Sequence, residues 1–199
     1  MRKLLPTAGV LCALWAGTAR ADIIFSDVVI HGDMGTPSVF TMQSYPYVDS
    51  ISFKFSDSLV GDDYAPRREA HATISFTAIA DTNMLLSGRT LRVGSELLGS
   101  GVLSISDQVE DVFTPGEIGS YSVDLDATAT MPHIGDTPFS RPTVEIRLTE
   151  TITIRAPDEA GLDLAALGVI THRFQQIPVP EPTSLALFAA TVAVFARRR

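Results

Sequence analysis

Apolar and polar residues alternate in short segments through the central part of the chain. Ile51, Phe53 and Phe55 fall on one face of such a segment, and Ser52 and Lys54 fall on the other. A period of two indicates a β-strand with one buried face, because successive side chains of a strand point to opposite sides. Comparable segments lie at 23–30, 39–43, 51–55, 74–79, 89–93, 103–106, 121–126, 144–154 and 170–175. The pattern predicts nine or ten strands.

Glycine and proline separate these segments, for example at Gly35, Gly61, Gly135 and Pro138. Turn residues at regular intervals between alternating segments are typical of antiparallel sandwiches. The only helical pattern lies at 158–167, and Gly161 weakens it because glycine disfavours helix. We therefore predict an all-β domain at 22–176, an antiparallel β-sandwich with a jelly-roll-like arrangement.

The N-terminus has the three-part layout of a secretory signal peptide. Arg2 and Lys3 precede an apolar stretch at 4–16, and small residues follow at Ala19 and Ala21 in the A-x-A arrangement. The apolar stretch is shorter than the roughly 20 residues that a membrane span needs. We predict a signal helix at 1–21 that signal peptidase removes after Ala21. The alternative is an uncleaved membrane anchor.

The C-terminal segment at 177–199 has a different composition from the domain before it. Pro178, Pro180 and Pro182 exclude helix and central strand, so an extended linker is expected. An uncharged, mostly apolar run from Leu185 to Ala196 follows, and Arg197, Arg198 and Arg199 end the chain. A cationic end remains in the cytoplasm, which makes the apolar run a short hydrophobic helix inserted transiently in the inner membrane. A permanent tail anchor is the alternative.

These C-terminal residues resemble the PEP-CTERM sorting signal. The elements that carry the resemblance are Val179, Pro180, Glu181 and Pro182, the hydroxyl pair Thr183 and Ser184, the apolar run and the arginine cluster. The order of the hydroxyl pair is reversed from the commoner one. The resemblance implies a bacterial protein that exosortase, an intramembrane transpeptidase, recognises and cleaves. It covers about 22 residues and implies delivery to the cell surface or extracellular matrix, often in bacteria that make extracellular polysaccharide.

Charge narrows the possible partners of the domain. The whole chain has 15 basic and 23 acidic residues. Without 1–21 and 181–199, which hold six of the basic residues and one of the acidic ones, nine basic and 22 acidic residues remain, a net charge of −13. Such a surface repels nucleic acid, which needs clustered cations. Cys12 lies in the signal segment, so the mature protein has no cysteine for a disulfide or thiolate site.

The sequence contains no clear metal or catalytic motif. The four histidines, His31, His71, His133 and His172, are not at metal-ligand spacing, and no G-x-S-x-G elbow is present. Two acidic loops are expected, one with Asp62 and Asp63 and one with Asp107, Glu110 and Asp111. Either offers oxygen ligands for calcium, although neither has EF-hand spacing. We predict no cofactor and leave calcium as the alternative.

Glu150 has the parity of a core residue. It shares one face with Ile146, Leu148, Ile152 and Ile154. Since an unpaired buried carboxylate costs several kcal/mol, we favour a bulge or turn at Glu150 and Thr151 that turns the side chain outward. The alternative is a buried Glu150 that is paired with an arginine.

Two tyrosines are the remaining candidate ligand residues. Tyr45 and Tyr47 flank Pro46, and exposed aromatic rings of this kind form platforms for sugar rings. We predict a non-catalytic, structural or adhesive protein of the cell surface or matrix. One alternative is a carbohydrate-binding module for extracellular polysaccharide. The other is a hydrolase that uses paired carboxylates, although no spacing in the sequence singles out a pair.

Overall fold

The computed structural model describes residues 22–44, 47–61, 67–157 and 163–179, without the side chains of 43–48. These residues form ten strands and no helix. The strands are β1 (Ile24–Gly32), β2 (Ser38–Ser44), β3 (Tyr47–Lys54), β4 (Glu69–Ile79), β5 (Met84–Leu98), β6 (Val102–Asp111), β7 (Glu117–Asp126), β8 (His133–Thr143), β9 (Glu145–Arg155) and β10 (Leu164–Pro178).

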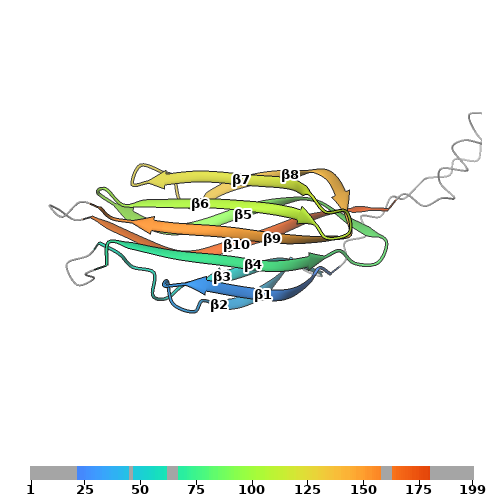
Figure 1. Cartoon of the computed structure of the whole chain (residues 1–199), viewed down its shortest axis with the longest axis horizontal. Coiled ribbons are helices and arrows are strands. Elements are labelled where there is room, and N and C mark those ends of the chain that lie inside the picture. The colour runs from blue at the N-terminus through green and yellow to red at the C-terminus, as the bar shows by residue number, and fades with distance from the viewer. Residues whose placement is uncertain (1–21, 45–46, 62–66, 158–162, 180–199) are drawn as a thin grey trace, which may run out of the picture.

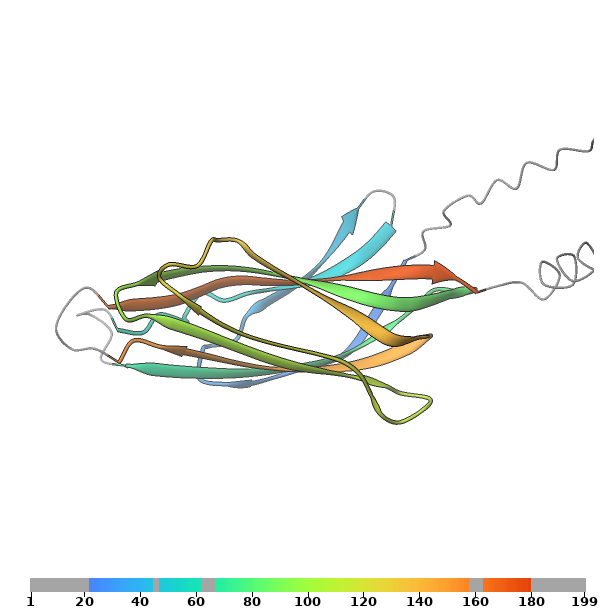
Figure 2. The ribbon, with the colours of Figure 1, turned by 90° about the horizontal axis from the view of Figure 1, so that it is seen from above.

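The ten strands form two five-stranded sheets. Sheet A has the order β1-β4-β9-β6-β7, and sheet B has the order β2-β3-β10-β5-β8. Every strand pair is antiparallel. Figures 1 and 2 show the two sheets face to face in an elongated sandwich. The predicted antiparallel β-sandwich is thus confirmed.

The strand order follows from how the chain crosses between the sheets. Strands β3, β10, β5 and β8 are neighbours in sheet B, and β4, β9, β6 and β7 are neighbours in sheet A. Two four-stranded sheets connected in this order form a jelly roll, in which two Greek keys are wrapped together. Strands β1 and β2 extend the two sheets at one side.

Strand β8 was missed in the sequence, and its residues explain why. Gly135 and Pro138 suggested turns, but both lie inside this strand. Strand β8 is at the edge of sheet B, so one side of its backbone has no neighbouring strand within the sheet. Proline, which lacks an N–H donor, is tolerated at such an edge.

Strand β10 replaces the weak helical pattern at 158–167. Residues 158–162 lie outside the described part of the chain, and Leu164 to Leu167 pair with β5. The same strand continues to Pro178, opposite Met84, so pairing extends two residues beyond the predicted domain boundary. The N–H of Val179 then donates a hydrogen bond to the carbonyl oxygen of Asn83 (2.9 Å).

The inner faces of the two sheets form the hydrophobic core. Phe53 and Phe76 come from opposite sheets, and their ring centroids lie 5.8 Å apart. The imidazole of His172 packs against Phe76 (5.3 Å) and Phe53 (6.0 Å). Burial of these aromatic side chains, together with the aliphatic residues around them, stabilises a domain that has no disulfide.

The predicted terminal helices at 1–21 and 185–196 lie outside the described residues, as do Ala19, Ala21 and everything from Pro180 to Arg199. The described part of the chain contains no helix with the length and apolarity to cross a membrane.

We predict that Gly101→Ala destabilises the fold by about 1–3 kcal/mol, the usual cost of overpacking. A Cβ atom at Gly101 would lie 2.1 Å from the carbonyl oxygen of Leu164, so backbone would have to move. Urea unfolding of the purified protein measures the change. Ser106→Ala, on the exposed face of β6, is the control and should shift the free energy of unfolding by no more than about 0.5 kcal/mol. Equal effects of the two substitutions would contradict this packing.

Candidate functional site

Four ionisable side chains meet in the centre of the sandwich. Arg89 comes from β5, Asp107 from β6, Glu150 from β9 and His172 from β10, and the side chains of all four are 0% exposed. On each strand the residue has the same parity as buried apolar neighbours. The four therefore point into the core between the sheets; we call them the buried charge cluster.

Two carboxyl groups of the buried charge cluster face one guanidinium. Asp107 and Glu150 are directly opposite each other on neighbouring strands of sheet A. From sheet B, Nη2 of Arg89 donates to Oδ2 of Asp107 (2.6 Å) and to Oγ1 of Thr137 (3.1 Å). Its Nη1 atom lies 3.9 Å from Oε2 of Glu150. The guanidinium thus connects the two sheets.

The protonation of His172 follows from its contact with Arg89. Nη1 of Arg89 lies 2.9 Å from Nδ1 of His172. Because arginine only donates hydrogen bonds, Nδ1 must accept, and a neutral ring carries its proton on Nε2. That nitrogen lies 3.6 Å from Oε1 of Glu150. The imidazole therefore contributes no charge in this arrangement.

Charge neutrality in the cluster requires one further proton. With His172 neutral, one guanidinium faces two carboxyl groups. Burial raises the pKa of Asp107 above its usual value and outweighs the opposing effect of Arg89, and the nearby Glu150 raises it further. Both effects favour a proton on the carboxyl pair, because a second uncompensated charge in the core is costly.

The structure corrects the favoured interpretation of Glu150. Strand β9 keeps an unbroken register with both β4 and β6 across Glu150 and Thr151, so no bulge turns the side chain outward. The alternative, a buried Glu150 that faces an arginine, is the arrangement observed. Sequence reasoning placed Asp107 in an acidic loop, took His172 as one of four scattered histidines and did not consider Arg89, although each has core parity in its strand.

The second predicted acidic loop does not exist. Asp107, Glu110 and Asp111 all lie within strand β6, with Glu110 exposed and Asp111 buried. The Asp111 carboxylate accepts hydrogen bonds from the N–H groups of Phe113 (2.9 Å) and Thr114 (3.1 Å). Burial acts to raise the pKa of Asp111, but these hydrogen bonds outweigh it and lower the pKa.

The other candidate sites fall partly outside the described residues. Asp62, Asp63 and Tyr45 are in undescribed segments, and Tyr47 begins β3 without a described side chain. Among the described residues, no three His, Cys, Asp or Glu side chains are grouped as a metal site requires.

The histidines are in four separate environments. His71 lies 3.3 Å from Glu69, and Nε2 of His133 is 2.7 Å from the hydroxyl of Tyr121. His31 is exposed on β1, whereas His172 is buried in the core.

The outer face of sheet B is hollowed at two adjoining places. The first, the Arg92 recess, has a volume of about 550 Å³ and is lined by Phe40, Met42, Ser52, Arg92, Gly94, Met131, Pro132, Val169 and Thr171. Its walls are mainly apolar, and Phe40 and Met42 are 40% and 48% exposed. Register aligns Phe40, Ser52, Thr171 and Arg92 in one row across four strands.

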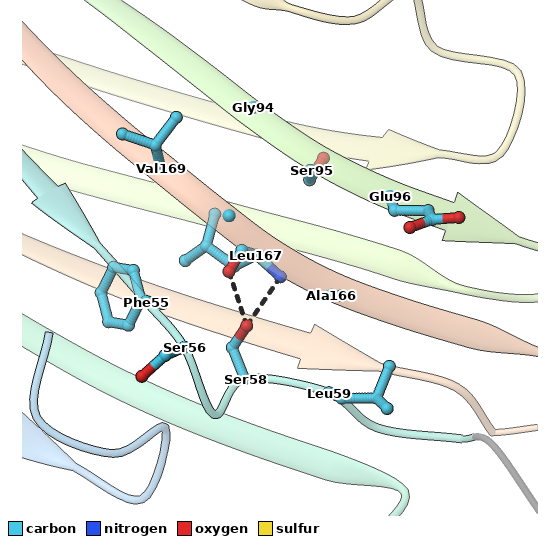
Figure 3. Close-up of a pocket in the computed structure, with 11 residues that line it drawn as sticks. Phe55, Ser56, Ser58, Leu59, Gly94, Ser95, Glu96, Ala166, Leu167 and Val169 are labelled. Atoms are coloured by element: carbon cyan, nitrogen blue, oxygen red, sulfur yellow. Dashed lines mark hydrogen bonds between the residues drawn. The ribbon is translucent and has the colours of Figure 1, made fainter.

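The second hollow, the Ser58 recess, shares Gly94 and Val169 with the first. Its volume is about 500 Å³, and Figure 3 shows its lining residues, with Ser58 hydrogen-bonded to Leu167 of β10. Oγ of Ser58 donates to the carbonyl oxygen of Leu167 (2.6 Å) and accepts from the Leu167 N–H (3.0 Å). This side chain replaces a backbone pairing and holds the segment after β3 against the sheet.

The fold and its surface define an all-β sandwich protein with a sealed charge cluster and a recessed sheet face. Comparison with protein families identifies the C-terminus: residues 178–199 match the PEP-CTERM protein-sorting motif. The chain is therefore a PEP-CTERM domain-containing protein, as its sequence predicted. This motif implies an exported protein that exosortase processes at the membrane.

Comparison with solved structures finds only weak likenesses. A carbohydrate-binding module, TmCBM61 in complex with β-1,4-galactotriose, is 13% identical over 77% of this chain and 89% of its own, with a TM-score of 0.31. A tailspike protein of bacteriophage CBA120 is 11% identical over 78% of this chain but 19% of its own, with a TM-score of 0.32. At these values the likeness carries no functional argument. No curated protein matches the chain.

We predict that Arg89→Met destabilises the protein by about 3–5 kcal/mol, because it leaves buried carboxylates without their cation. Urea unfolding at neutral pH measures the loss. Arg92→Met is the matched control, since Arg92 is exposed on the opposite face of the same strand. It should change stability by no more than about 0.5 kcal/mol. A small effect of Arg89→Met would contradict the bridging role of the guanidinium.

The raised pKa of Asp107 predicts a specific pH dependence. Between the pKa of Asp107 in the unfolded chain and its higher pKa in the folded protein, the folded protein binds more protons than the unfolded chain. The free energy of unfolding therefore falls as the pH rises through the pKa of the folded state. Asp107→Asn removes this loss. The stability of the variant relative to the unaltered protein should therefore improve as pH rises above about 4, the ordinary pKa of an aspartate.

Unfolding curves across this range test the prediction. Asp124→Asn, at an exposed position on β7, serves as the control. Parallel pH profiles for the Asp107→Asn variant and the unaltered protein would show that Asp107 does not titrate differently in the fold.

Proposed function

We propose that the mature domain is a non-catalytic adhesive protein of the cell surface or extracellular matrix. This proposal rests on one observation: a cluster of charged side chains lies inside the core, whereas large apolar side chains are exposed on the surface. The ionisable groups of the buried charge cluster are 0% exposed, whereas Phe40 and Met42 line an open recess. Chemistry on a substrate requires contact with solvent-accessible groups, while adhesion requires an accessible, partly apolar surface.

For the alternative of a hydrolase there is now a specific pair of carboxyl groups to consider, but a substrate has no access to this pair. Asp107 and Glu150 are adjacent carboxyl groups, the residue types that glycosidases use. Both lie between the sheets and face Arg89. A glycosidic bond cannot reach them without separation of the sheets, so this arrangement favours a structural role for the pair.

The positions of the chain ends support processing at a membrane. Strand β1 begins at Ile24 opposite Ile79, and β10 ends at Pro178 opposite Met84. Ile79 and Met84 flank the turn between β4 and β5, so both ends of the described chain lie at the same end of the sandwich, as Figure 2 also shows. This geometry is compatible with a precursor that is held by hydrophobic segments at both ends.

A carbohydrate-binding module is the second candidate function. The recessed face of sheet B favours it, because ligand sites are concave and mainly apolar with a few polar groups. Strands β2 and β3, which contribute Phe40, Met42 and Ser52, also flank the undescribed Tyr45. We predict that such a module would be retained on polysaccharide and that removing Tyr45 and Tyr47 would abolish this retention.

Intact mass and cell fractionation in the native host test the proposed location. We expect a chain that begins at Asp22 and ends between Pro180 and Thr183, recovered outside the inner membrane. Replacing Pro180 and Pro182 with alanine should retain the Arg199 end and hold the protein in the inner membrane. If the unaltered protein keeps Arg199 and remains in that membrane, it is a tail-anchored protein and the surface role is wrong.

A further inference from the structure

The Arg92 recess places a free cation on an otherwise acidic protein. Only nine basic residues accompany 22 acidic ones between residues 22 and 180. The side chain of Arg92 is exposed and forms no ion pair with any described residue. Arg173, on the same face, is instead neutralised by Asp49 (2.8 Å). The guanidinium of Arg92 is therefore available for an external anion.

The surroundings of Arg92 suit a ring-shaped ligand. Phe40 and Met42 stand on one side of the recess, and Met131 and Pro132 also line it. In its floor, the half-buried Thr171 shares a hydrogen bond of 2.8 Å with the buried Ser52, and the Thr171 hydroxyl has a further lone pair to offer. Apolar walls of this kind contact the C–H face of a sugar ring, while the Thr171 hydroxyl in the floor can bind its edge.

Gly94 keeps the centre of this face open. It lies in the middle of β5 and lines both recesses, where a Cβ atom would come within 3.2 Å of Val169 Cγ1. Glycine inside a strand costs stability and often marks a close approach of ligand or backbone. Here part of its role is to accommodate the register shift of β10 next to Val169, and its position also joins the two recesses.

We propose that the Arg92 recess binds an acidic sugar of an extracellular polysaccharide, with the sugar carboxylate on the guanidinium of Arg92. This inference rests on the proposed surface or matrix role and names its ligand class. Arginine binds a carboxylate through two parallel hydrogen bonds, which fixes the orientation of the sugar. The exposed Lys54, opposite Val169 on β3, adds a second cation to the same face.

The charge distribution favours sparse acidic groups over a dense polyanion. Glu96 lies four residues from Arg92 on the same face of β5 and lines the Ser58 recess. A second acid group at that recess would be repelled. The net charge of −13 likewise repels nucleic acid, where every nucleotide carries a phosphate. A polymer in which acidic and neutral sugars alternate fits both recesses best.

Affinity measurements with the processed protein from its host test the proposal. The probes are hyaluronan, in which acidic and neutral sugars alternate, polygalacturonate, in which every sugar is acidic, and neutral dextran. We expect hyaluronan to bind most tightly, and Arg92→Gln to weaken that binding at least tenfold. Phe40→Ser should weaken it as well, and Glu96→Gln should improve binding of polygalacturonate.

Arg147→Gln is the matched control, because it removes one exposed cation from β9 on the opposite sheet. It should leave binding unchanged within twofold, and thermal unfolding should confirm that every variant is folded. Equal losses for Arg92→Gln and Arg147→Gln, equal binding of dextran, or tighter binding of polygalacturonate than of hyaluronan would each overturn the proposal. Such results for a protein found at the cell surface would leave the proposed location intact, whereas an unprocessed inner-membrane protein would contradict the location itself.

Discussion

The burial of Arg89 constrains how the two sheets can stack. A guanidinium removed from water is stable only where anions and acceptors surround it, and here these come from three strands other than its own. Asp107 is in sheet A, whereas Thr137 and His172 are in sheet B. Sliding one sheet by a residue would move Asp107 and Glu150 away from the guanidinium, so the cluster fixes the register between the sheets in a way that apolar contacts do not.

The same constraint explains the environment of His172. Its ring contacts Phe53 and Phe76 with one side and Arg89 with Nδ1. Aromatic core and charge cluster are therefore continuous, and a change of the ring's orientation would disturb both. A buried charge cluster is weak evidence for high stability, since apolar residues of equal volume often serve as well. Its contribution here is specificity of packing, which an exported domain without disulfides must obtain from its core.

The sequence predicted the type of fold because alternation is strong in the segments that became β3, β4, β6, β7 and β9. It failed at β8, where an edge position tolerates Pro138 and Gly135 that would interrupt a central strand. For the cluster, parity was the available signal, and it was considered only for Glu150. Arg89 follows the parity of Leu91, and His172 that of Ile170. Charged residues with core parity on four separate strands would together have indicated an internal network, whereas a single one suggested a bulge.

The two recesses could not be predicted from the sequence because they depend on which strands become neighbours in the sheet. Phe40, Ser52, Thr171 and Arg92 are spread over more than 130 positions of the chain and meet only through the order of sheet B. The location of the recesses also agrees with the proposed processing of the C-terminal segment. Val179 is bound to the turn between β4 and β5, and Leu185 follows six residues later, a distance of at most about 20 Å. Insertion of the apolar run in the membrane, as proposed for the precursor, would hold that turn close to the membrane, whereas the Arg92 recess lies on the outer face of sheet B. The proposed ligand binding and the processing at the Pro-Glu-Pro box would then use different surfaces, and neither would have to wait for the other.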